Sequence, residues 1–328
     1  PEAVAALEPD VVCFQELWET RHAASISNAF AARGLRHARH FDGPGGRTGL
    51  FVASRWPIRE AAFRPFSVGR MPHSLWHLDW MVEKGVADVL VRTPAGDVRL
   101  ENMHLQAQYR TDAYGAERLA QAIELVLGGR GRTDEALLVV GDFNGRGDEL
   151  PRRALRDLGE LEDANPQSSE DSVYARGGRE LAVRIAGARA ALSEGFRLED
   201  GVTRPLSDHA AVVVDLELSP CSPCERARRN VSATRSAATA SLERAADVTP
   251  LRATLAILAA AALLVFGVAL GRQSIAAASR RRIVLRRLGF ALLAAGFVWC
   301  FYLGTVYYPT RAKLLRRIAA ELVRLPAR

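Results

Sequence analysis

Cysteine is scarce in this chain, with 4 residues among 328. Cys221 and Cys224 form a Cys-x-x-Cys pair, but no second pair exists that could complete a zinc site. Cys13 lies in an apolar run and Cys300 in a long hydrophobic segment, so the pattern predicts no disulfide framework. We therefore expect a fold that depends on a hydrophobic core, in a reducing compartment.

The two parts of the chain have opposite net charges, because each has fewer charged residues of one sign than of the other. Residues 1–218 contain 26 Lys and Arg against 33 Asp and Glu, a net charge of −7. Residues 219–328 contain 18 Lys and Arg against only 4 Asp and Glu, a net charge of +14. DNA is bound largely through neutralisation of its phosphates by basic side chains. Because the N-terminal part lacks that basic excess, we expect no nucleic acid as a partner.

Polar side chains lie beside apolar, strand-like runs at several points of the N-terminal part. They are carboxylates, one amide and two histidines, namely Glu16, His104, Asp142, Asn144, Asp208 and His209. A sheet that gathers these points at one edge would bring the side chains together. Carboxylate and amide oxygens suit a hard cation such as Mg²⁺, and histidine can move a proton near neutral pH. The pattern predicts one metal-dependent phosphodiesterase site.

These residues also have purely structural interpretations. Glu16 could be a loop carboxylate, and residues 142–144 could form a turn at the end of a strand. Residues 208–209 could cap the segment that follows them, and a single histidine such as His104 is more often a satisfied core residue. Lys84 could be a solvated strand residue. The occurrence of all the motifs in one chain favours the site.

Strand-like and helix-like segments alternate along residues 1–218. The pattern predicts strands ending at Glu16 and at 49–53, 84–91, 98–103, 137–141 and 210–216, and helices at 21–33, 111–127 and 150–158. Mixed strands with helices between them indicate an α/β layered domain. At 218 residues this part is long enough for one large core.

Two long hydrophobic runs lie in the C-terminal part. Residues 253–270 are 18 positions without a charge, and residues 288–308 are 21. A bilayer core of ~30 Å needs about 20 apolar helical residues, so both runs are predicted to be transmembrane helices. The alternative is a pair of buried core helices. Residues 219–252, rich in Pro, Ser, Thr, Ala and Arg, are predicted to be a linker.

A transmembrane hairpin places the N-terminal domain and the tail 309–328 on one side, and the loop 271–287 on the other. Nine basic residues lie near the helix ends on the first side, against six in the loop. This excess favours a cytosolic catalytic domain. In the tail, apolar residues at helical spacing alternate with basic ones. They predict an amphipathic helix on anionic lipid, with a solvated basic end as the alternative.

Further segments carry a family resemblance, namely residues 46–58, 78–80, 83–86 and 103–109. Together with the polar motifs they resemble the neutral sphingomyelinases of the endonuclease/exonuclease/phosphatase superfamily, and the resemblance covers residues 1–218. The C-terminal hairpin resembles the membrane-bound members of that group. The resemblance implies a two-sheet α/β sandwich flanked by helices that hydrolyses membrane sphingomyelin to ceramide and phosphocholine. It also implies a Mg²⁺ cofactor, with Mn²⁺ as the alternative.

The resemblance implies roles for the metal ligands and for the base. Glu16 would be the main Mg²⁺ ligand, with Asp208 beside the metal. His209 would be the general base that activates water for in-line attack on the phosphorus. This assignment agrees with the chemistry that the residues themselves suggest.

The same resemblance implies roles at the substrate. Asp142 and Asn144 would bind and orient the phosphate and the attacking water. His104 would steady the phosphate or the leaving oxygen. Asp79 and Lys84 would bind the substrate. These residues complete the expected site.

Two features depart from the family pattern. A strand that carries an Asn metal ligand would precede Pro1, so we expect the sequence to be a fragment. Where the family has an Asp that orients the catalytic histidine, residues 184–187 place Ala186. In serine proteases, loss of the corresponding carboxylate function costs about 10⁴-fold in rate. No replacement partner for His209 is identifiable from the sequence.

Three hypotheses follow. The chain is an active Mg²⁺-dependent sphingomyelin phosphodiesterase, a membrane-anchored scaffold that has lost turnover, or a phosphodiesterase of another phospholipid. Ala186 is the feature that separates the first two. The acidic domain and the membrane anchor argue against a nucleic acid substrate. No feature of the sequence indicates an oligomeric state.

Overall fold

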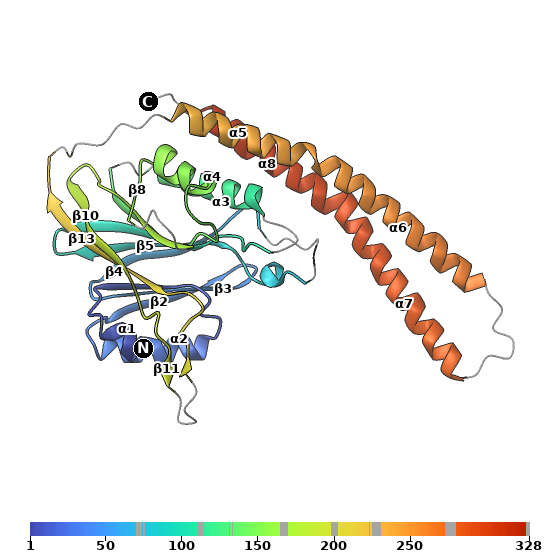
Figure 1. The fold of residues 1–328 in the computed structure, drawn as a ribbon, viewed down its shortest axis with the longest axis horizontal. Coiled ribbons are helices and arrows are strands. Elements are labelled where there is room, and N and C mark those ends of the chain that lie inside the picture. Colours follow the sequence, from blue (N-terminus) through green and yellow to red (C-terminus); the bar gives the residue numbers. More distant parts are fainter. Residues whose placement is uncertain are drawn as a thin grey trace. The chain divides into compact units, whose positions relative to one another are not determined.

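The computed structural model describes residues 1–69, 74, 76–109, 114–130, 132, 134–164, 170–197, 203–222, 224, 231–272 and 280–325. Contacts divide the chain into two compact units, Pro1–Ala238 with Leu325–Arg328, and Thr239–Arg324. Every described strand belongs to the first unit, and the described part of the second unit is helical (Figure 1).

The larger sheet has six strands in the order β4-β5-β6-β7-β9-β8. They are β4 (Ile58–Pro65), β5 (Gly85–Thr93), β6 (Gly96–His104), β7 (Ala136–Asp142), β8 (Glu162–Asp163) and β9 (Asp171–Arg176). β6 and β7 run parallel, whereas the other neighbours in this sheet are antiparallel. The ends of β6 and β7 therefore lie at the same edge of the sheet.

A three-stranded sheet faces the larger one, in the order β1-β3-β2. Its strands are β1 (Val11–Phe14), β2 (His37–Gly43) and β3 (Gly46–Ser54). One buried apolar cluster fills the space between the two sheets, with Leu50 and Val52 from β3 against Val89 from β5 and Leu100 from β6. Because strand side chains alternate between faces, the neighbours of these residues point away from the shared core. The predicted two-sheet α/β sandwich is confirmed.

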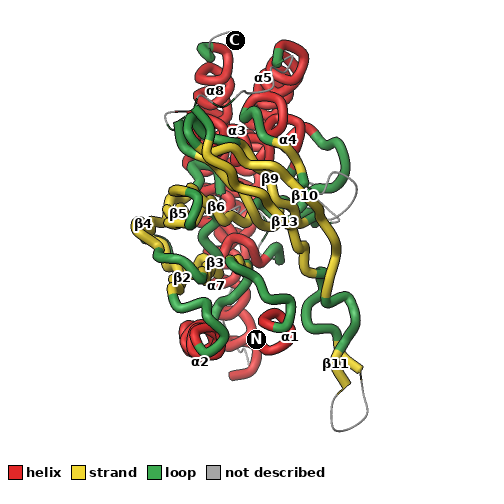
Figure 2. The backbone as a smooth tube through the Cα atoms, turned by 90° about the vertical axis from the view of Figure 1, so that its left-hand side faces the viewer, coloured by secondary structure: helices red, strands yellow, loops and turns green. Residues whose placement is uncertain are grey.

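Two smaller ladders complete the strands. β10 (Leu181–Ala191) pairs with β13 (Ala211–Pro220), and β11 (Phe196–Arg197) pairs with β12 (Thr203–Arg204). β10 and β13 lie beside β9, as Figure 2 shows. Beyond the end of β13, a disulfide joins Cys221 and Cys224, a bridge that the spacing of the cysteines did not predict.

Helices cover the outer faces of the two sheets (Figure 1). They are α1 (Glu2–Ala5) and α2 (Thr20–Ala31) beside the three-stranded sheet, and α3 (Gly115–Arg130), α4 (Leu150–Arg153) and the π-helical turn η2 (Ala154–Leu158) beside the larger sheet. Phe30 of α2 packs in a second apolar cluster with Phe51 of β3. The helices predicted at 21–33 and 150–158 are confirmed, and residues 111–113 of the third predicted helix lie outside the described part.

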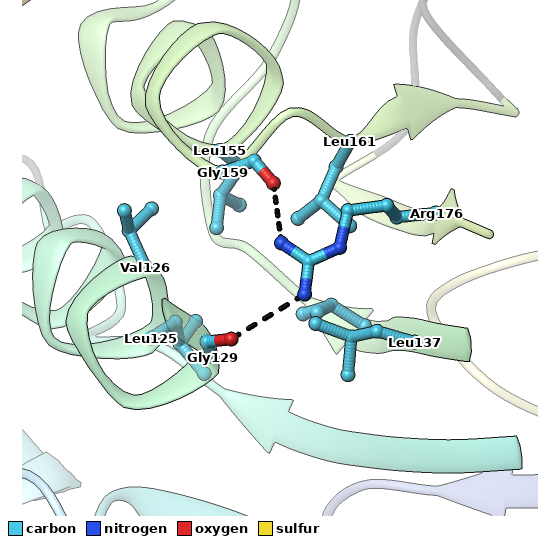
Figure 3. A pocket seen from close by; sticks show the side chains of 9 residues that line it. Leu125, Val126, Gly129, Leu137, Leu155, Gly159, Leu161 and Arg176 are labelled. Carbon is cyan, nitrogen blue, oxygen red and sulfur yellow. Dashed lines mark hydrogen bonds between the residues drawn. The ribbon is translucent and has the colours of Figure 1, made fainter. Parts of the chain in front are cut away.

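The side chain of Arg176, at the end of β9, connects two of these helices to the sheet through hydrogen bonds. Its guanidinium donates to the carbonyl oxygens of Gly159, at 2.9 Å, and of Gly129, at 3.4 Å (Figure 3). Both glycines follow or end a helix, where backbone carbonyls have no partner within the helix. A small gap between α3, η2 and β7 is lined by Leu125, Leu155 and other apolar side chains beside this arginine. We interpret it as a gap in the packing beside Arg176, whose side chain caps the two helix ends.

A network of buried charges lies on the face of β5 and β6 that points away from the shared core. Arg99 donates to Asp88 at 3.1 Å, and Arg64 donates to Glu101 at 2.8 Å. Arg132 also pairs with Asp88. Burial raises the pKa of Glu101 to about 7, although the charge of Arg64 lowers it. Glu101 therefore keeps its proton to a higher pH in the folded chain than an exposed glutamate does.

The second unit is built from long helices. α5 (Ser232–Asp247), whose residues 232–238 still belong to the first unit, is followed closely by α6 (Thr249–Arg272). The chain returns through α7 (Arg280–Tyr302), the π-helical turn η3 (Leu303–Tyr307) and α8 (Tyr308–Val323). Two helical stretches, Ser232–Leu270 and Ile283–Val323, are long and apolar enough to cross a membrane. α5 lies within the segment predicted to be a linker.

A close approach fixes the packing of α6 against η3. A Cβ atom on Gly304 would lie 2.8 Å from the carbonyl oxygen of Ala253 and 2.5 Å from the side chain of Ile257. Small residues allow membrane helices to approach to this distance. In its first turn, α8 is hydrogen-bonded to the start of α6, because Arg311 donates to the hydroxyl of Thr249 at 2.9 Å.

The predicted amphipathic tail is helical in α8, but its apolar face is covered. Leu315, Ile318 and Leu322 are buried, whereas Lys313 and Arg317 are exposed on the same helix. The basic side of α8 therefore remains open to solvent or lipid. Binding of anionic lipid by this tail stays a prediction.

The charge network predicts how stability depends on pH. The pKa of Glu101 lies at about 7 in the folded chain against a reference of 4.5, so the folded state binds its proton more tightly than the unfolded state. Its contribution to stability is complete below pH 4.5 and is lost as pH rises to about 7. The expected loss is at most about 3 kcal/mol.

We expect Glu101→Gln to remove this part of the pH dependence. Urea unfolding of the whole chain in detergent micelles, followed by tryptophan fluorescence between pH 5 and pH 8, measures it. Glu217→Gln, on an exposed glutamate of β13, is the matched control. An unchanged slope of unfolding free energy against pH in Glu101→Gln would contradict the assignment.

Candidate functional site

The parallel pairing of β6 and β7 places the first two site residues. His104 and Asp142 are register partners at the ends of these strands. Gly141 precedes Asp142 with φ 136, and a Cβ atom there would lie 1.9 Å from the carbonyl oxygen of Met103 on β6. Only glycine allows this approach, so Gly141 determines how close the two site residues lie. His104 Nε2 is 3.4 Å from Asp142 Oδ2.

Asn144 turns back onto Asp142. Its backbone N–H donates to Oδ1 of Asp142 at 2.7 Å, and its side-chain amide donates to Oδ2 at 3.0 Å. The amide also donates to the carbonyl oxygen of Leu105 at 3.1 Å. Asn144 has φ 49, in the left-handed region. Residues 142–144 do form a turn, as the structural interpretation held, and this turn fixes the orientation of the Asp142 carboxylate.

His104 is buried against a lysine and an aspartate. Lys84 Nζ lies 2.9 Å from His104 Nε2 and 3.2 Å from Asp79 Oδ1. The other oxygen of Asp79 accepts from the side chain of Gln106 at 2.9 Å and from the backbone N–H of Ala107 at 2.7 Å. Lys84 is 3% exposed, so the interpretation of this residue as a solvated strand position is wrong.

Burial determines the protonation of this group. Burial lowers the pKa of Lys84, while the charge of Asp79 raises it in part. Burial and the charge of Lys84 hold the pKa of His104 well below 6.5. His104 is therefore a neutral imidazole whose Nε2 accepts a hydrogen bond from the lysine amine, and it carries no positive charge.

Glu16 follows β1 and faces the same histidine. Its Oε1 lies 4.0 Å from His104 Nε2, and its side chain is 61% exposed. The backbone of Glu16 has φ 60, and Gly49 leaves room for it, since a Cβ there would lie 3.0 Å from the Glu16 Cα. Left-handed backbone at non-glycine residues is strained and gathers at functional sites. Glu16 and Asn144 both have it.

His209 approaches from a different part of the fold, just before β13. Its Nδ1 lies 2.8 Å from Oδ2 of Asp171, and its Nε2 lies 3.4 Å from Oε2 of Glu170. Burial lowers the pKa of His209. The charges of Asp171 and Asp142 raise it by more than burial lowers it, so the pKa lies above 6.5. Asp171 was not among the predicted site residues. The sequence signal for it was an acidic pair, 170–171, directly before an alternating apolar run.

Asp142 and Asp171 concentrate negative charge at this edge. Burial, followed by the charge of Asp171, raises the pKa of Asp142 to about 6. Burial also raises the pKa of Asp171. Ligand atoms of Asp142, Asp171 and His209 lie within 4.8 Å of one another, close enough to share a cation. Two acidic oxygens and an imidazole form a donor set that Mg²⁺ or Mn²⁺ accepts.

Asp208 is placed differently from its predicted partners. It is exposed, and its contact is with the hydroxyl of Ser207 at 3.4 Å. Neither Asp208 nor Glu16 belongs to the group of three that lies within 4.8 Å. Among the predicted residues, the structure brings Asp142 together with Asn144, His104 and His209, and joins His104 to Lys84 and Asp79.

Known proteins are similar to this chain in sequence and in fold. The profile of the Endonuclease/Exonuclease/phosphatase family matches residues 1–209. An inositol phosphosphingolipids phospholipase C of Schizosaccharomyces pombe is 28% identical over 235 residues, which cover 68% of this chain and 55% of that protein. Sphingomyelin phosphodiesterase 2 of Mus musculus is 31% identical over 121 residues, 36% of this chain and 29% of that protein. The chain thus spans about half the length of the first of these relatives.

Solved structures with a similar fold include sphingomyelinase C from Streptomyces griseocarneus. The two chains are 17% identical, with a TM-score of 0.48, over 67% of this chain and 91% of the other. The catalytic domain of human Nocturnin is similar at a TM-score of 0.48 and 18% identity, over 66% of this chain and 84% of the other.

Gly141→Ala is expected to separate the ends of β6 and β7. The new methyl would collide with the carbonyl oxygen of Met103, and alanine disfavours a φ of 136. We expect a loss of about 2–4 kcal/mol of unfolding free energy, measured by urea unfolding. Gly147→Ala is the control, since Gly147 has φ 58 but no atom within 4 Å of the new methyl. Equal losses in the two variants would contradict the close-contact argument.

Asp79→Ala is expected to leave the Lys84 amine buried without its carboxylate. Breaking a buried pair in this way costs about 3–5 kcal/mol. Lys84→Met in the same chain should recover part of that loss, because the uncompensated charge is then gone. Thermal unfolding of both single variants and of the double variant measures the coupling. Strictly additive losses would show that the two side chains do not depend on each other.

Proposed function

The chain belongs to the endonuclease/exonuclease/phosphatase family, and we propose that it hydrolyses the phosphodiester of a membrane sphingolipid, with sphingomyelin as the substrate and ceramide and phosphocholine as products. The single observation that carries the proposal is the gathering of His104, Asp142 and His209 at one sheet edge. The relatives named as sphingolipid phosphodiesterases support the choice of substrate class.

We propose Mg²⁺ as the cofactor, with Mn²⁺ as the alternative. Glu16 and Asp208 would hold it as ligands, and Asp142 offers a further buried carboxylate. The chemistry of the edge fits a cation, because burial raises the pKa values of Asp142 and Asp171, the charge of Asp171 raises that of Asp142 further, and a bound cation would offset this accumulation of carboxylates. Bound there, the ion would draw charge from the phosphate oxygens.

The proposed roles of the side chains follow from their contacts. His209 would take a proton from the attacking water as general base. Asn144 holds the Asp142 carboxylate in one orientation, and the two would orient the phosphate and the water. His104, neutral and hydrogen-bonded to Lys84, would steady the phosphate or the leaving oxygen.

Asp79 and Lys84, predicted to bind substrate, are both buried. We propose that they act at the phosphate through His104, because Lys84 contacts the histidine and Asp79 compensates the lysine charge. In this arrangement a substitution of either residue would change the position of His104.

We propose that the two apolar helical stretches cross the bilayer and hold the catalytic domain on the cytosolic side. Their length and composition support this proposal, as do the large hydrophobic side chains exposed on α6 and α7, such as Leu258, Phe266 and Leu292. A membrane anchor suits an enzyme whose substrate is itself a bilayer lipid.

A second substrate in the same class is an inositol phosphosphingolipid. The name of the relative in Schizosaccharomyces pombe favours it. The two substrates share the scissile phosphodiester and differ in the headgroup that is released. Vesicles of the two lipids, assayed in parallel, separate these alternatives.

Hydrolysis of sphingomyelin vesicles by the membrane-embedded chain tests the proposal. We expect phosphocholine release that requires Mg²⁺ and stops with a chelator. His209→Ala should lower the rate by about 10²- to 10⁴-fold, the usual contribution of a general base. Asp215→Asn, on an exposed aspartate of β13, is the control that should keep the rate.

Release at an equal rate in His209→Ala, or release that persists without a divalent cation, would contradict the proposed mechanism. Release from neither lipid would favour the scaffold hypothesis.

A further inference from the structure

We propose that Asp171 is the positioning residue for His209, in place of the carboxylate that β10 does not supply. This inference rests on the proposed function, in which His209 is the general base. It adds one residue, Asp171, whose carboxylate holds the imidazole in a fixed orientation and tautomer.

The register of the sheet places Asp171 at the site. β7 and β9 are antiparallel, and Asp171 is the Cα partner of Asp142. The start of β9 therefore lies at the same edge as the end of β7, with the two carboxylates side by side on one face. The hydrogen bond from Phe143 N–H to the carbonyl oxygen of Glu170, at 2.9 Å, continues the ladder past this pair. The backbone of Asp171 is thus fixed by regular sheet structure.

The contact with His209 sets the tautomer. Nδ1 of His209 lies 2.8 Å from Oδ2 of Asp171, a hydrogen-bond distance. A carboxylate only accepts, so Nδ1 carries the proton and donates it. In the neutral imidazole the lone pair is then on Nε2, the nitrogen that would take the proton of the attacking water. A histidine in the opposite tautomer would present a proton where a base is required.

A second carboxylate lies on the other side of the ring. Oε2 of Glu170 is 3.4 Å from Nε2 of His209, and Oε1 of Glu170 accepts from Arg146 at 3.1 Å. The arginine compensates the charge of Glu170, whereas Asp171 makes the shorter contact with the ring. Asp171 is also the more buried of the two, at 18% against 29% side-chain exposure. These differences favour Asp171 as the residue that fixes the ring.

β10 has no carboxylate to offer at the corresponding place. Ala186 is exposed and ends in a methyl group, and the β10–β13 register shifts between Ile185 and Gly187. Asp215, across the ladder from Gly187, is paired with Arg189 at 2.9 Å. The carboxylate that is hydrogen-bonded to His209 therefore comes from the start of β9, and the alanine at 186 does not leave the histidine without a partner.

The competing role for Asp171 is that of a cation ligand, since its oxygens lie within 4.8 Å of ligand atoms of Asp142 and His209. The two roles differ in what they predict. A positioning residue affects the rate of the chemical step and the tautomer of His209. A ligand affects the concentration of Mg²⁺ that is needed for half-maximal rate.

The test compares Asp171→Asn and Asp171→Glu with the whole chain in sphingomyelin-containing vesicles, with Asp215→Asn as the matched aspartate-to-asparagine control. Rates are measured across substrate and Mg²⁺ concentrations. Separately, ¹⁵N-histidine NMR of the chain in detergent micelles, without Mg²⁺, reads the tautomer of His209. The signal is assigned by its absence in His209→Ala.

We expect Asp171→Asn to lower kcat by about 10³- to 10⁴-fold, with KM and the half-activating Mg²⁺ concentration changed by less than about twofold. Asp171→Glu should recover part of the rate, and the Nδ1–H tautomer should dominate in the native chain but not in Asp171→Asn. An unchanged kcat and tautomer would overturn the proposal. Restoration of the rate of Asp171→Asn by excess Mg²⁺ would overturn it in favour of a cation ligand. If the native chain shows no turnover, the proposed function fails, and the tautomer alone decides the role of Asp171.

Discussion

The parallel pairing of β6 with β7, flanked by the antiparallel β9, is the constraint on which the site depends. In that arrangement the ends of two strands and the start of a third meet at one edge, so that His104, Asp142 and Asp171 become neighbours. Gly141 makes the close approach between β6 and β7 possible. Residues that are far apart in the sequence are thereby held by backbone hydrogen bonds before any ligand is bound.

The same edge gathers polar groups that are costly to bury. Asp142 and Asp171 have raised pKa values because they share a poorly solvated space. The lysine beside His104 is compensated chiefly by Asp79, whose carboxylate accepts two N–H hydrogen bonds. Buried charges persist where partners and hydrogen bonds offset their desolvation. The unfavourable electrostatic free energy of these groups could be offset when a phosphate and a cation bind beside them.

The sequence was sufficient to predict the polar residues that follow strands, and also His209, which precedes β13, but it was insufficient for Asp171. Asp142 and Asn144 were found because each follows a strong apolar run. Asp171 was missed because it begins a strand, and only the antiparallel pairing with β7 brings that start to the active edge. The burial of Lys84 could not be predicted from the sequence either, because it depends on how a loop packs against β6. No local sequence pattern indicates that packing. The strands and the apolar helices were predictable because periodicity and hydropathy determine them, whereas the two-sheet arrangement was predicted from the family resemblance.

The most direct test of the account is to locate a divalent cation in the folded protein. Crystals of the chain grown with Mn²⁺ would show the ion by its anomalous scattering. The account predicts one strong peak within coordination distance of Asp142, at the edge where β6, β7 and β9 meet, with Glu16 and Asp208 as the further proposed ligands. A peak that lies elsewhere, or the absence of any peak at this edge with Mn²⁺ in excess, would contradict it.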